Sequence, residues 1–457
     1  MFPSVPISAE ALQAAADYAL LQGLLKYPLK GQLTHAPFTV APAPIAQQTH
    51  QQLVELTASF QTLYQSVSAQ FEGLEAMLAP LAQSDAFLDE MLAMARQTAN
   101  ARAQQPLKFL LTRNDYFLAT SPQGVQPRQV EMNMIAAGYG PFAGIVHRLH
   151  AHMYPQQAAH LVPNHPLEAM TDAFEAAVKA YGYPHAGVLL VVQFNEKNRF
   201  DQRLIEFSLK ARGIPAQRVE LARLTEVARI KEGHLEVNGV VAAVTYLRAG
   251  YGPEDWKLES EREGRRLIEE SSTLAAPELS QQLAGTKKVQ QMLARPGALS
   301  PYVSPKVAQQ LESAFAIICD PEDVLERGSQ AGKVAWQAAL QQPQNWVLKP
   351  QREGGGYNLY DDQMVNTLKG STVAQRKAYI LMERLRPAAH AGEGVLDFTP
   401  HPLQLVPEIG RFGAWLGQNG QEMLNRDMGY LVRSKAQDAP EGGVSAGYGF
   451  LDSLYFS

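Results

Sequence analysis

A continuous apolar run, Val-Leu-Leu-Val-Val at residues 188–192, constrains the fold of this chain more than any other segment. A strand that is apolar on both faces has to be covered on both sides, which is typical of the central strands of a parallel α/β sheet. Helical spacing follows over residues 200–212, a second strand is predicted at 217–221, and Asn238-Gly239 indicates a tight hairpin. These patterns predict an α/β domain over residues 185–284.

The segments on either side of this domain differ in character. Apolar residues recur at helical spacing over residues 9–26 and 51–102, so the N-terminal part is predicted to be helical. Two strands, at 108–113 and 129–135, are predicted to form a hairpin or to be neighbours in a sheet. A second α/β region follows, with strands predicted near Ile317, Val347, Ile380, Leu405, Phe412 and Leu431.

Composition excludes several classes of protein. The chain has 457 residues, 46% of them hydrophobic, and a formal charge of −5, so no polyanionic partner such as nucleic acid is needed to explain it. The lone Cys319 excludes an internal disulfide framework and is interpreted as a buried thiol in a reducing compartment. No stretch approaches the roughly 20 apolar residues of a membrane span, so the cytoplasm is the expected location.

The segment from Lys349 to Asn358 combines two cations, one carboxylate and the triplet Gly354, Gly355 and Gly356, directly after a predicted buried strand. Glycine amides can approach phosphate oxygens closely, and a carboxylate beside them can hold a divalent ion, so the segment favours polyphosphate binding. A flexible surface turn is the alternative. The pattern matches neither a Walker loop nor the Gly-x-Gly-x-x-Gly of dinucleotide folds.

Two further patterns bear on metal binding. Glu131 and Asn133 lie two apart on a predicted strand, so their side chains share one face, and with Glu353 they offer three oxygen ligands for Mg²⁺. An exposed sheet face would have the same pattern. The helix bearing His147, His150 and His152 lacks a companion cluster of acids or cysteines and is interpreted as a helix without metal.

Three other segments are candidate ligand contacts. Residues 285–288 are predicted to begin a helix, where Lys287 would reinforce phosphate binding by the backbone amides. Residues 380–385 are predicted to form an apolar strand whose backbone can hydrogen-bond the edge of an adenine base. Arg433, whose planar fork suits a carboxylate, precedes a second loop of small residues at 441–447. The alternatives are a surface lysine at position 287, an ordinary core strand at 380–385 and a turn at 441–447.

The ordered set of motifs closely resembles eukaryotic-type glutathione synthetases, permuted members of the ATP-grasp ligases. The matching segments are residues 36–39, 113–116, 131–133, 198–202, 282–291, 349–358 and 442–447. The resemblance implies an α/β ATP-grasp architecture with a helical N-terminal region, a parallel-sheet substrate domain and a small lid. It implies a core of 1–184, 285–345 and 399–457, a substrate-binding domain of 185–284 and a lid of 346–398 that carries the glycine-rich loop.

The resemblance also implies an ATP-dependent ligase that joins γ-glutamylcysteine to glycine through an acyl phosphate, as a cytoplasmic homodimer. Magnesium is implied at Glu131, Asn133 and Glu353, and the catalytic residues at Arg433, Lys349 and Glu353. The implied ATP contacts are Lys287, Lys349, Glu353, Gly354, Gly355, Gly356, Tyr357, Asn358, Tyr360, Met382, Glu383, Leu385, Glu408, Lys435 and Glu441. The implied contacts to the dipeptide, glycine and product are Arg113, Glu196, Asn198, Gln202, Arg248, Tyr251, Arg433, Val444 and Ser445.

The chain departs from the family pattern at four positions. Ala136 and Gly138 stand where serines are usual, Ala249 stands where an aspartate is usual, and Ser445 replaces an alanine. These changes leave the expected ATP contacts unchanged and affect the expected contacts to the dipeptide and to the amine acceptor. The alternatives are therefore a related peptide ligase with another dipeptide or amine, such as β-alanine, or a nucleotide-binding protein without turnover.

Overall fold

The computed structural model describes residues 2, 7–26, 33–121, 124–321, 330–351, 357–439, 444 and 449–457. Seven strands form the central sheet in the order β16-β3-β19-β18-β17-β5-β6. Their bounds are β3 Phe38–Thr39, β5 Leu107–Ser121, β6 Gly124–Asn133, β16 His390–Leu396, β17 Thr399–Gln418, β18 Gln421–Ala436 and β19 Gly449–Asp452. The predicted hairpin is confirmed, because β5 and β6 pair antiparallel.

The longest strand of this sheet corrects one prediction. The strands predicted near Leu405 and Phe412 are one continuous element, β17, which runs between β18 and β5. Pro407, Gly410 and Gly413 suggest breaks in the sequence, because proline lacks a ladder donor and glycine weakens a strand. The neighbouring strands pair with β17 over most of its length and absorb the irregularity in a register shift between Arg411 and Gly413.

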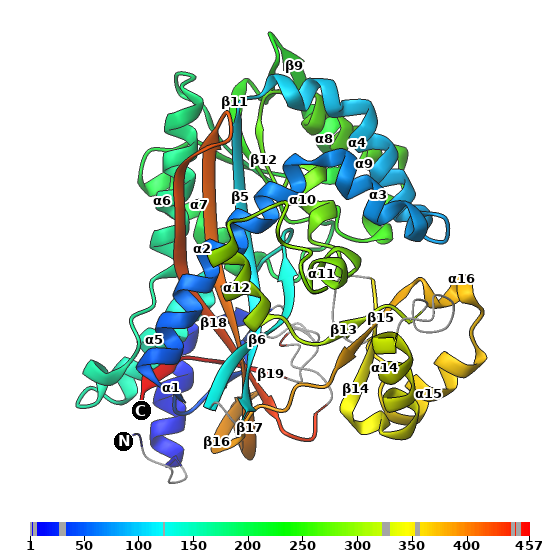
Figure 1. The fold of residues 1–457 in the computed structure, drawn as a ribbon. Helices are drawn as coiled ribbons and strands as arrows, with labels where there is room; N and C mark the ends of the chain where they lie inside the picture. Colours follow the sequence, from blue (N-terminus) through cyan, green and yellow to red (C-terminus); the bar gives the residue numbers. More distant parts are fainter. Residues whose placement is uncertain are drawn as a thin grey trace.

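Helices cover both faces of the central sheet (Figure 1). One face packs on α2 (Gln47–Ala69), which contacts β17 and β18, and the other packs on α5 (Gly140–Met153) and α6 (Pro166–Tyr181). Around α2 lie α3 (Phe71–Ala82), α4 (Ala86–Gln104), α10 (Leu279–Ala284), α11 (Lys287–Leu293) and α12 (Pro305–Ala314), and α1 (Ala9–Leu21) packs on α5. The prediction of a helical N-terminal part is thus confirmed for α1 to α4. Two short pairings, β1 (Leu25–Lys26) with β2 (Thr34–His35) and β4 (Ala43–Ile45) with β20 (Leu454–Phe456), lie outside the central sheet.

The apolar run at 188–192 lies in β7 (Gly187–Val192), which is buried along its whole length as predicted. Its sheet contains β8 (Ala216–Glu220), β9 (Ala228–Lys231), β10 (His234–Val237), β11 (Val240–Leu247) and β12 (Leu274–Ala276). Strands β8, β7, β11 and β12 are parallel, whereas β9 and β10 are antiparallel to their neighbours. The reason is two two-residue turns, Glu232-Gly233 between β9 and β10 and Asn238-Gly239 between β10 and β11, since a parallel neighbour would need a long crossover. The helices of this region are α7 (Arg199–Ala211), α8 (Leu224–Val227) and α9 (Glu259–Glu270).

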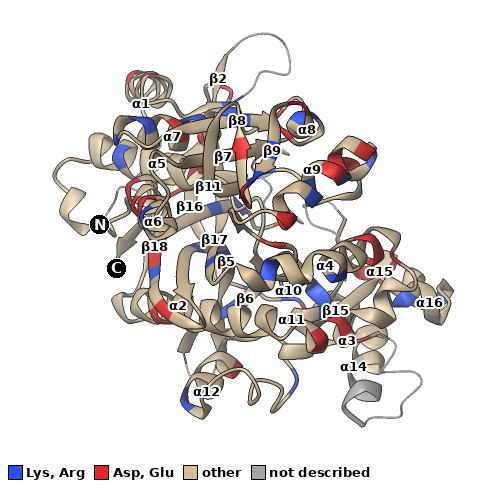
Figure 2. Ribbon diagram, turned by 90° about the horizontal axis from the view of Figure 1, so that it is seen from above, with Lys and Arg blue, Asp and Glu red and all other residues tan. Residues whose placement is uncertain are grey.

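A third, small sheet has the order β13-β15-β14. Its strands β13 (Ile318–Cys319), β14 (Trp346–Pro350) and β15 (Tyr379–Glu383) lie beside α14 (Gln330–Gln341), α15 (Asp361–Gly370) and α16 (Val373–Arg376). Figure 2 shows these elements grouped on one side of the molecule. Cys319 is only half-buried, and the expectation of a core thiol therefore holds in part; burial raises the pKa of its thiol to about 11.

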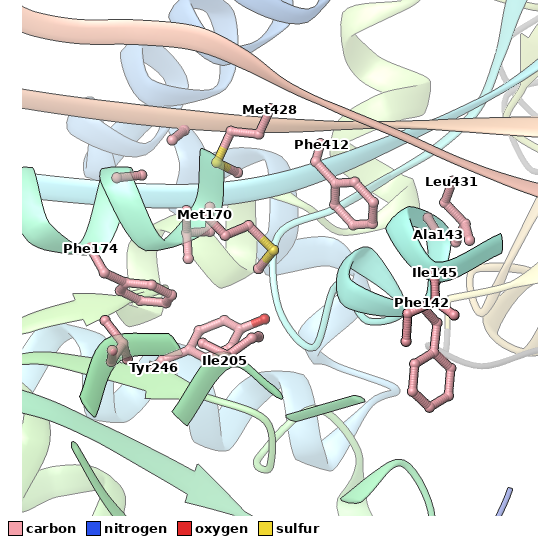
Figure 3. Packing of buried hydrophobic residues seen from close by; sticks show 14 of the residues in the cluster. Phe142, Ala143, Ile145, Met170, Phe174, Ile205, Tyr246, Phe412, Met428 and Leu431 are labelled. Carbon is pink, nitrogen blue, oxygen red and sulfur yellow. The ribbon is translucent and has the colours of Figure 1, made fainter. Parts of the chain in front are cut away.

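The main hydrophobic core lies between the central sheet and the second sheet. Figure 3 shows Met170 and Phe174 of α6 between Met428 and Phe412 of the long strands and Tyr246 of β11. The rings of Phe174 and Tyr246 meet edge to face with their centroids 5.3 Å apart. Helix α6 therefore joins the two sheets into one unit by burying apolar side chains on both of its sides. None of the helices within the described ranges combines the length and apolar character needed to span a bilayer.

His150, one of the three histidines considered for metal binding, is a structural residue. Its Nδ1 lies 2.7 Å from Oγ of Ser453 and its Nε2 lies 2.7 Å from the carbonyl oxygen of Thr39. Both ring nitrogens are therefore occupied within the fold, as the interpretation of a helix without metal requires. Burial is the main reason that the pKa of His150 falls to about 4.

We expect His150 to make the protein less stable in acid. The unfolded chain binds a proton at His150 near the ordinary pKa of 6.5, whereas the folded chain resists it down to about 4. Between about pH 7 and about pH 5 this difference removes about 2 kcal/mol from the free energy of unfolding. Urea denaturation at both pH values measures it, and His150→Gln should lose that part of the pH dependence. An unchanged pH dependence in the variant would contradict the assignment.

Candidate functional site

A cavity of about 530 Å³ opens between the central sheet and the small sheet. Strands β5, β6, β17 and β18 form one wall, β14 and β15 form the other, and Lys287 contributes from the start of α11. The two sheets thus bring side chains from four parts of the chain to one place. The wall residues named among the sequence candidates are Arg113, Glu131, Asn133, Lys287, Lys349, Asn358, Tyr360, Met382, Glu383, Leu385, Glu408, Arg433 and Lys435.

Asp115 holds the basic residues of this cavity in place. It is fully buried, and its two carboxylate oxygens accept hydrogen bonds from Nε and Nη2 of Arg113 at 2.7 and 2.8 Å. Nη2 of Arg433 donates to the same carboxylate at 2.8 Å and to Oε1 of Glu408 at 2.6 Å. Both guanidinium groups are thereby fixed by charge-assisted bonds, which are stronger than neutral ones.

Gly410 makes room for this network. It pairs with Asp115 across β17 and β5, and a Cβ atom on Gly410 would lie 2.5 Å from Oδ1 of Asp115 and 2.8 Å from Cδ of Arg113. Real side chains do not approach so closely. Any residue other than glycine at position 410 would therefore displace the ion pair between Arg113 and Asp115. The glycine that looks like a break in the sequence is therefore part of the site.

Glu131 is the carboxylate of this cavity that is best suited to hold a cation. Its side chain is 28% exposed and its Oε2 lies 3.4 Å from Nζ of Lys287. Burial alone would raise its pKa, but Lys287, Lys349, Arg433 and Arg113 together lower the pKa of Glu131 to about 2. The pKa of the neighbouring Glu408 is raised, because its burial outweighs the attraction of Arg433. Glu131 is therefore ionised at neutral pH.

Asn133 lies on the same face of β6 and has a fixed orientation. Its Nδ2 donates to the carbonyl oxygen of Arg113 at 3.2 Å and to Oδ2 of Asp115 at 3.0 Å, which leaves its Oδ1 as an available ligand. Among the described residues, no three His, Cys, Asp or Glu side chains gather as a metal cluster. Glu131 and Asn133 nevertheless fit Mg²⁺, which uses one or two protein carboxylates and takes its other ligands from waters and phosphates.

The opposite wall has features that suit a nucleotide base. Met382 of β15 is buried, and Arg384 and Leu385 follow the end of this strand on the cavity wall; the guanidinium carbon of Arg384 lies 5.1 Å from the centre of the Tyr360 ring. Oε1 of Glu383 accepts a hydrogen bond from the backbone N of Ile317 at 2.9 Å. Apolar side chains with a few fixed polar groups are the usual lining of such sites.

Of the residues expected to contact the dipeptide, glycine and product, Arg113 and Arg433 line the cavity, whereas Glu196, Asn198, Gln202, Arg248 and Tyr251 do not. Arg113 connects the two places, because its Nη1 lies 3.4 Å from the carbonyl oxygen of Gly138. A Cβ atom on Gly138 would lie 2.7 Å from Nη2 of Arg248 and 2.8 Å from Nδ2 of Asn198. Arg248 and Asn198 therefore occupy the space that a serine side chain would need.

Four other expected contacts, Glu196, Tyr251, Tyr357 and Val444, lie in separate places. The backbone N of Asn198 donates to Oε1 of Glu196 at 2.8 Å, so these two residues lie together. Tyr251 and Tyr357 line a second cavity of about 110 Å³. Val444 is buried within the main hydrophobic core. The expected site residues Glu353, Gly354, Gly355, Gly356, Glu441 and Ser445 lie outside the described residues.

Asp115 is the residue of this site that sequence reasoning did not single out. It lies two positions after Arg113 on one predicted strand, and this spacing places both side chains on the same face. That signal alone could have suggested an ion pair. The contacts to Arg433 and Asn133 could not be found in this way, because they join residues 318 and 18 positions apart.

The central sheet and the small sheet, with a cation-lined cavity between them, suit an enzyme that binds a nucleotide. A sequence profile for the eukaryotic glutathione synthase ATP-binding domain matches residues 7–456. Glutathione synthetase of Homo sapiens is 34% identical over 98% of this chain and 96% of its own length, and that of Bos taurus is 33% identical with the same coverage. The chloroplastic glutathione synthetase of Arabidopsis thaliana is 32% identical over 98% of this chain and 84% of its own length.

The fold has a solved counterpart in a glutathione synthetase-like effector from Globodera pallida, with a TM-score of 0.79. The two share 20% identity over 98% of this chain and 97% of the other, so this likeness concerns the fold alone. The chain belongs to the eukaryotic glutathione synthetase family. The family, the α/β ATP-grasp fold and the enzyme class predicted from the sequence are thereby confirmed.

Proposed function

We propose that the chain forms glutathione from ATP, γ-L-glutamyl-L-cysteine and glycine, and releases ADP and phosphate. The observation that carries this proposal is the convergence of Lys287, Lys349 and Arg433 with Glu131 and Asn133 in one cavity between two sheets. Cations there match the charge of a triphosphate, and the ionised Glu131 matches a divalent ion that accompanies it.

The proposed reaction needs no protein nucleophile. A carboxylate oxygen of the dipeptide attacks the γ-phosphorus of ATP, the bond to the bridging oxygen breaks, and ADP leaves. The amine of glycine then attacks the acyl carbon, loses a proton, and inorganic phosphate departs. Lys349 and Arg433 stabilise the charge of the phosphoryl group, and the fixed position of Arg433 limits reorganisation during the reaction.

Magnesium belongs to this proposal as the metal that Glu131, Asn133 and, by resemblance, Glu353 hold. When bound, Mg²⁺ neutralises phosphate charge and orients the phosphoryl group. Glutathione synthetase relatives from plants carry the word chloroplastic in their names. For this chain we propose a cytoplasmic homodimer on the basis of the family resemblance, and sedimentation of the purified protein tests the dimer.

The function is tested by incubating the purified chain with ATP, Mg²⁺, γ-glutamylcysteine and glycine. We expect release of ADP and phosphate that depends on the dipeptide, together with a tripeptide of the mass of glutathione. Omitting glycine should abolish the tripeptide. Nucleotide binding without dipeptide-dependent ADP release would contradict the proposal and favour a protein without turnover.

A related ligase with a different dipeptide or amine is the second candidate, and the observation that favours it is the crowding at Gly138. A panel of γ-glutamyl dipeptides with glycine or β-alanine distinguishes the two by the masses of the products. A strong preference for γ-glutamylcysteine and glycine would exclude the second candidate.

Restoring the usual serine at position 138 should weaken the use of the dipeptide. A side chain there would push Nη2 of Arg248 and Nδ2 of Asn198 away from their positions. We expect Gly138→Ser to raise KM for the dipeptide about tenfold, since small displacements of positioning groups are costly. KM for ATP should not change. Steady-state kinetics checks this, Gly138→Ala should act in the same direction, and a lower KM in Gly138→Ser would contradict it.

A further inference from the structure

Arg218 of β8 lies behind the residues that the family resemblance assigns to the dipeptide. Its Nη2 donates to Oε1 of Gln202 on α7 at 2.6 Å. Gln202 is completely buried, and with its oxygen engaged its Nε2 is directed elsewhere and has no hydrogen-bond partner. Arg218 therefore sets the orientation of a buried amide whose donor group is available to a ligand.

Two more donors in the same cluster have no partner. They are Nη1 of Arg218 and Nε of Arg248, both buried. A buried donor without an acceptor costs free energy, which a ligand that accepts its hydrogen bond would recover. The three donors come from α7, from β8 and from the residue that follows β11, and a ligand with several acceptor oxygens would satisfy them.

Two guanidinium groups of this cluster, those of Arg218 and Arg248, favour an anion as the ligand. In the part of the chain that the structure describes, Arg218 and Arg248 form no ion pair with a carboxylate, and Nη1 of Arg248 donates to the Tyr246 hydroxyl at 3.1 Å. Arg203, by contrast, pairs with Glu206 at 2.5 Å. The pKa of Arg218 is lowered to about 10, mainly by burial and also by the positive charges of Arg203 and Arg248. Glu196 and Glu206 raise the pKa of Arg218, and Asp201 and Glu196 raise that of Arg248 against the effect of burial, so charges of both signs surround the two guanidinium groups.

We propose that Arg218, with Gln202 and Arg248, binds the α-carboxylate of the γ-glutamyl group, which makes Arg218 a further substrate-binding residue. This inference rests on the proposed function. The γ-glutamyl group carries a free α-carboxylate and a free α-amine, and a carboxylate offers several acceptor positions to the three donors. Glu196, whose negative charge acts on both Arg218 and Arg248, is available for the α-amine.

The test compares γ-glutamylcysteine with its analogue in which the α-carboxylate is a carboxamide. In the wild type we expect the carboxylate form to bind at least about tenfold tighter by isothermal titration calorimetry, as charge-assisted hydrogen bonds allow. Arg218→Met should raise Kd and KM for the carboxylate form about tenfold, with little change in kcat or in KM for ATP. The analogue should bind both proteins similarly, so that discrimination between the two ligands is lost.

Two variants separate this role from a merely structural one. Arg203→Met removes a neighbouring cation that is already paired with Glu206, and it should keep the wild-type discrimination. Arg218→Lys keeps a positive charge and should retain part of the discrimination, and it serves as the test if Arg218→Met does not fold. The inference would be overturned if Arg218→Met discriminated between the two ligands as the wild type does. It would also be overturned if Arg218→Lys discriminated as well as Arg203→Met.

The binding measurement also separates this inference from the proposed function. A wild type that makes glutathione while Arg218→Met discriminates normally would overturn the role of Arg218 alone. A wild type that binds the dipeptide with Arg218-dependent discrimination but makes no tripeptide would support the role of Arg218 and overturn the proposed function.

Discussion

Asp115→Ala should lower the free energy of unfolding by about 3–5 kcal/mol, since removing one member of a buried ion network leaves charges uncompensated. Asp115 is fully buried and accepts hydrogen bonds from Arg113, Asn133 and Arg433 at 2.7 to 3.0 Å. The variant leaves the two guanidinium groups of Arg113 and Arg433 without this carboxylate. Urea denaturation measures the loss, and turnover should fall below detection.

The matched control for this variant is Asp172→Ala. Asp172 also pairs with two arginines, Arg212 and Arg426, but its side chain is 47% exposed. Exposed ion pairs contribute little, so Asp172→Ala should cost less than about 1 kcal/mol. If Asp115→Ala does not fold, Asp115→Asn, which has nearly the same shape without the charge, should fold with reduced stability and reduced turnover. Equal costs for the Asp115 and Asp172 variants would show that the buried network does not organise the site.

Glu131→Gln should change the response of the enzyme to magnesium. The substitution keeps the size of the side chain but removes its negative charge. Four neighbouring cations keep the Glu131 carboxylate ionised, and this carboxylate is proposed to hold the metal. We expect the Mg²⁺ concentration for half-maximal rate to rise at least about tenfold and kcat/KM for ATP to fall about 100- to 1000-fold. Initial rates of ADP release over a range of Mg²⁺ concentrations measure both quantities.

Glu278→Gln is the control for the Glu131 variant. Glu278 is also a buried carboxylate with a lysine partner, Lys108, whose Nζ lies 2.8 Å away, but it does not line the cavity. Although burial raises the pKa of Glu278, Lys108 and Arg102 lower it below its ordinary value. Its substitution removes the same charge and should leave the magnesium response unchanged. A similar shift in both variants, or none in Glu131→Gln, would rule out Glu131 as a metal ligand.

Local patterns were sufficient to predict many elements of the fold. The apolar run in β7, the helical spacing in α7 and the Asn238-Gly239 turn each depend on the preferences of neighbouring residues, and the structure confirms them. The continuity of β17 could not be predicted, because Gly410 and Pro407 are tolerated only through their partners on β5 and β18. Strand β9 was not predicted, although the two-residue Glu232-Gly233 turn that pairs it with β10 is a local feature.

The functional site, like the fold, could be predicted only in part from the sequence. The sequence by itself determined the family, the nature of the cations and carboxylates, and the spacing that places Glu131 and Asn133 on one face, because all of these are properties of residue types and their order. Only the tertiary structure decided that Asp115 joins Arg113 to Arg433, that Arg248 takes the space over Gly138, and that Arg218 orients Gln202. The physical reason is that each of these contacts joins separate strands or helices, and its geometry exists only when the sheets have packed together.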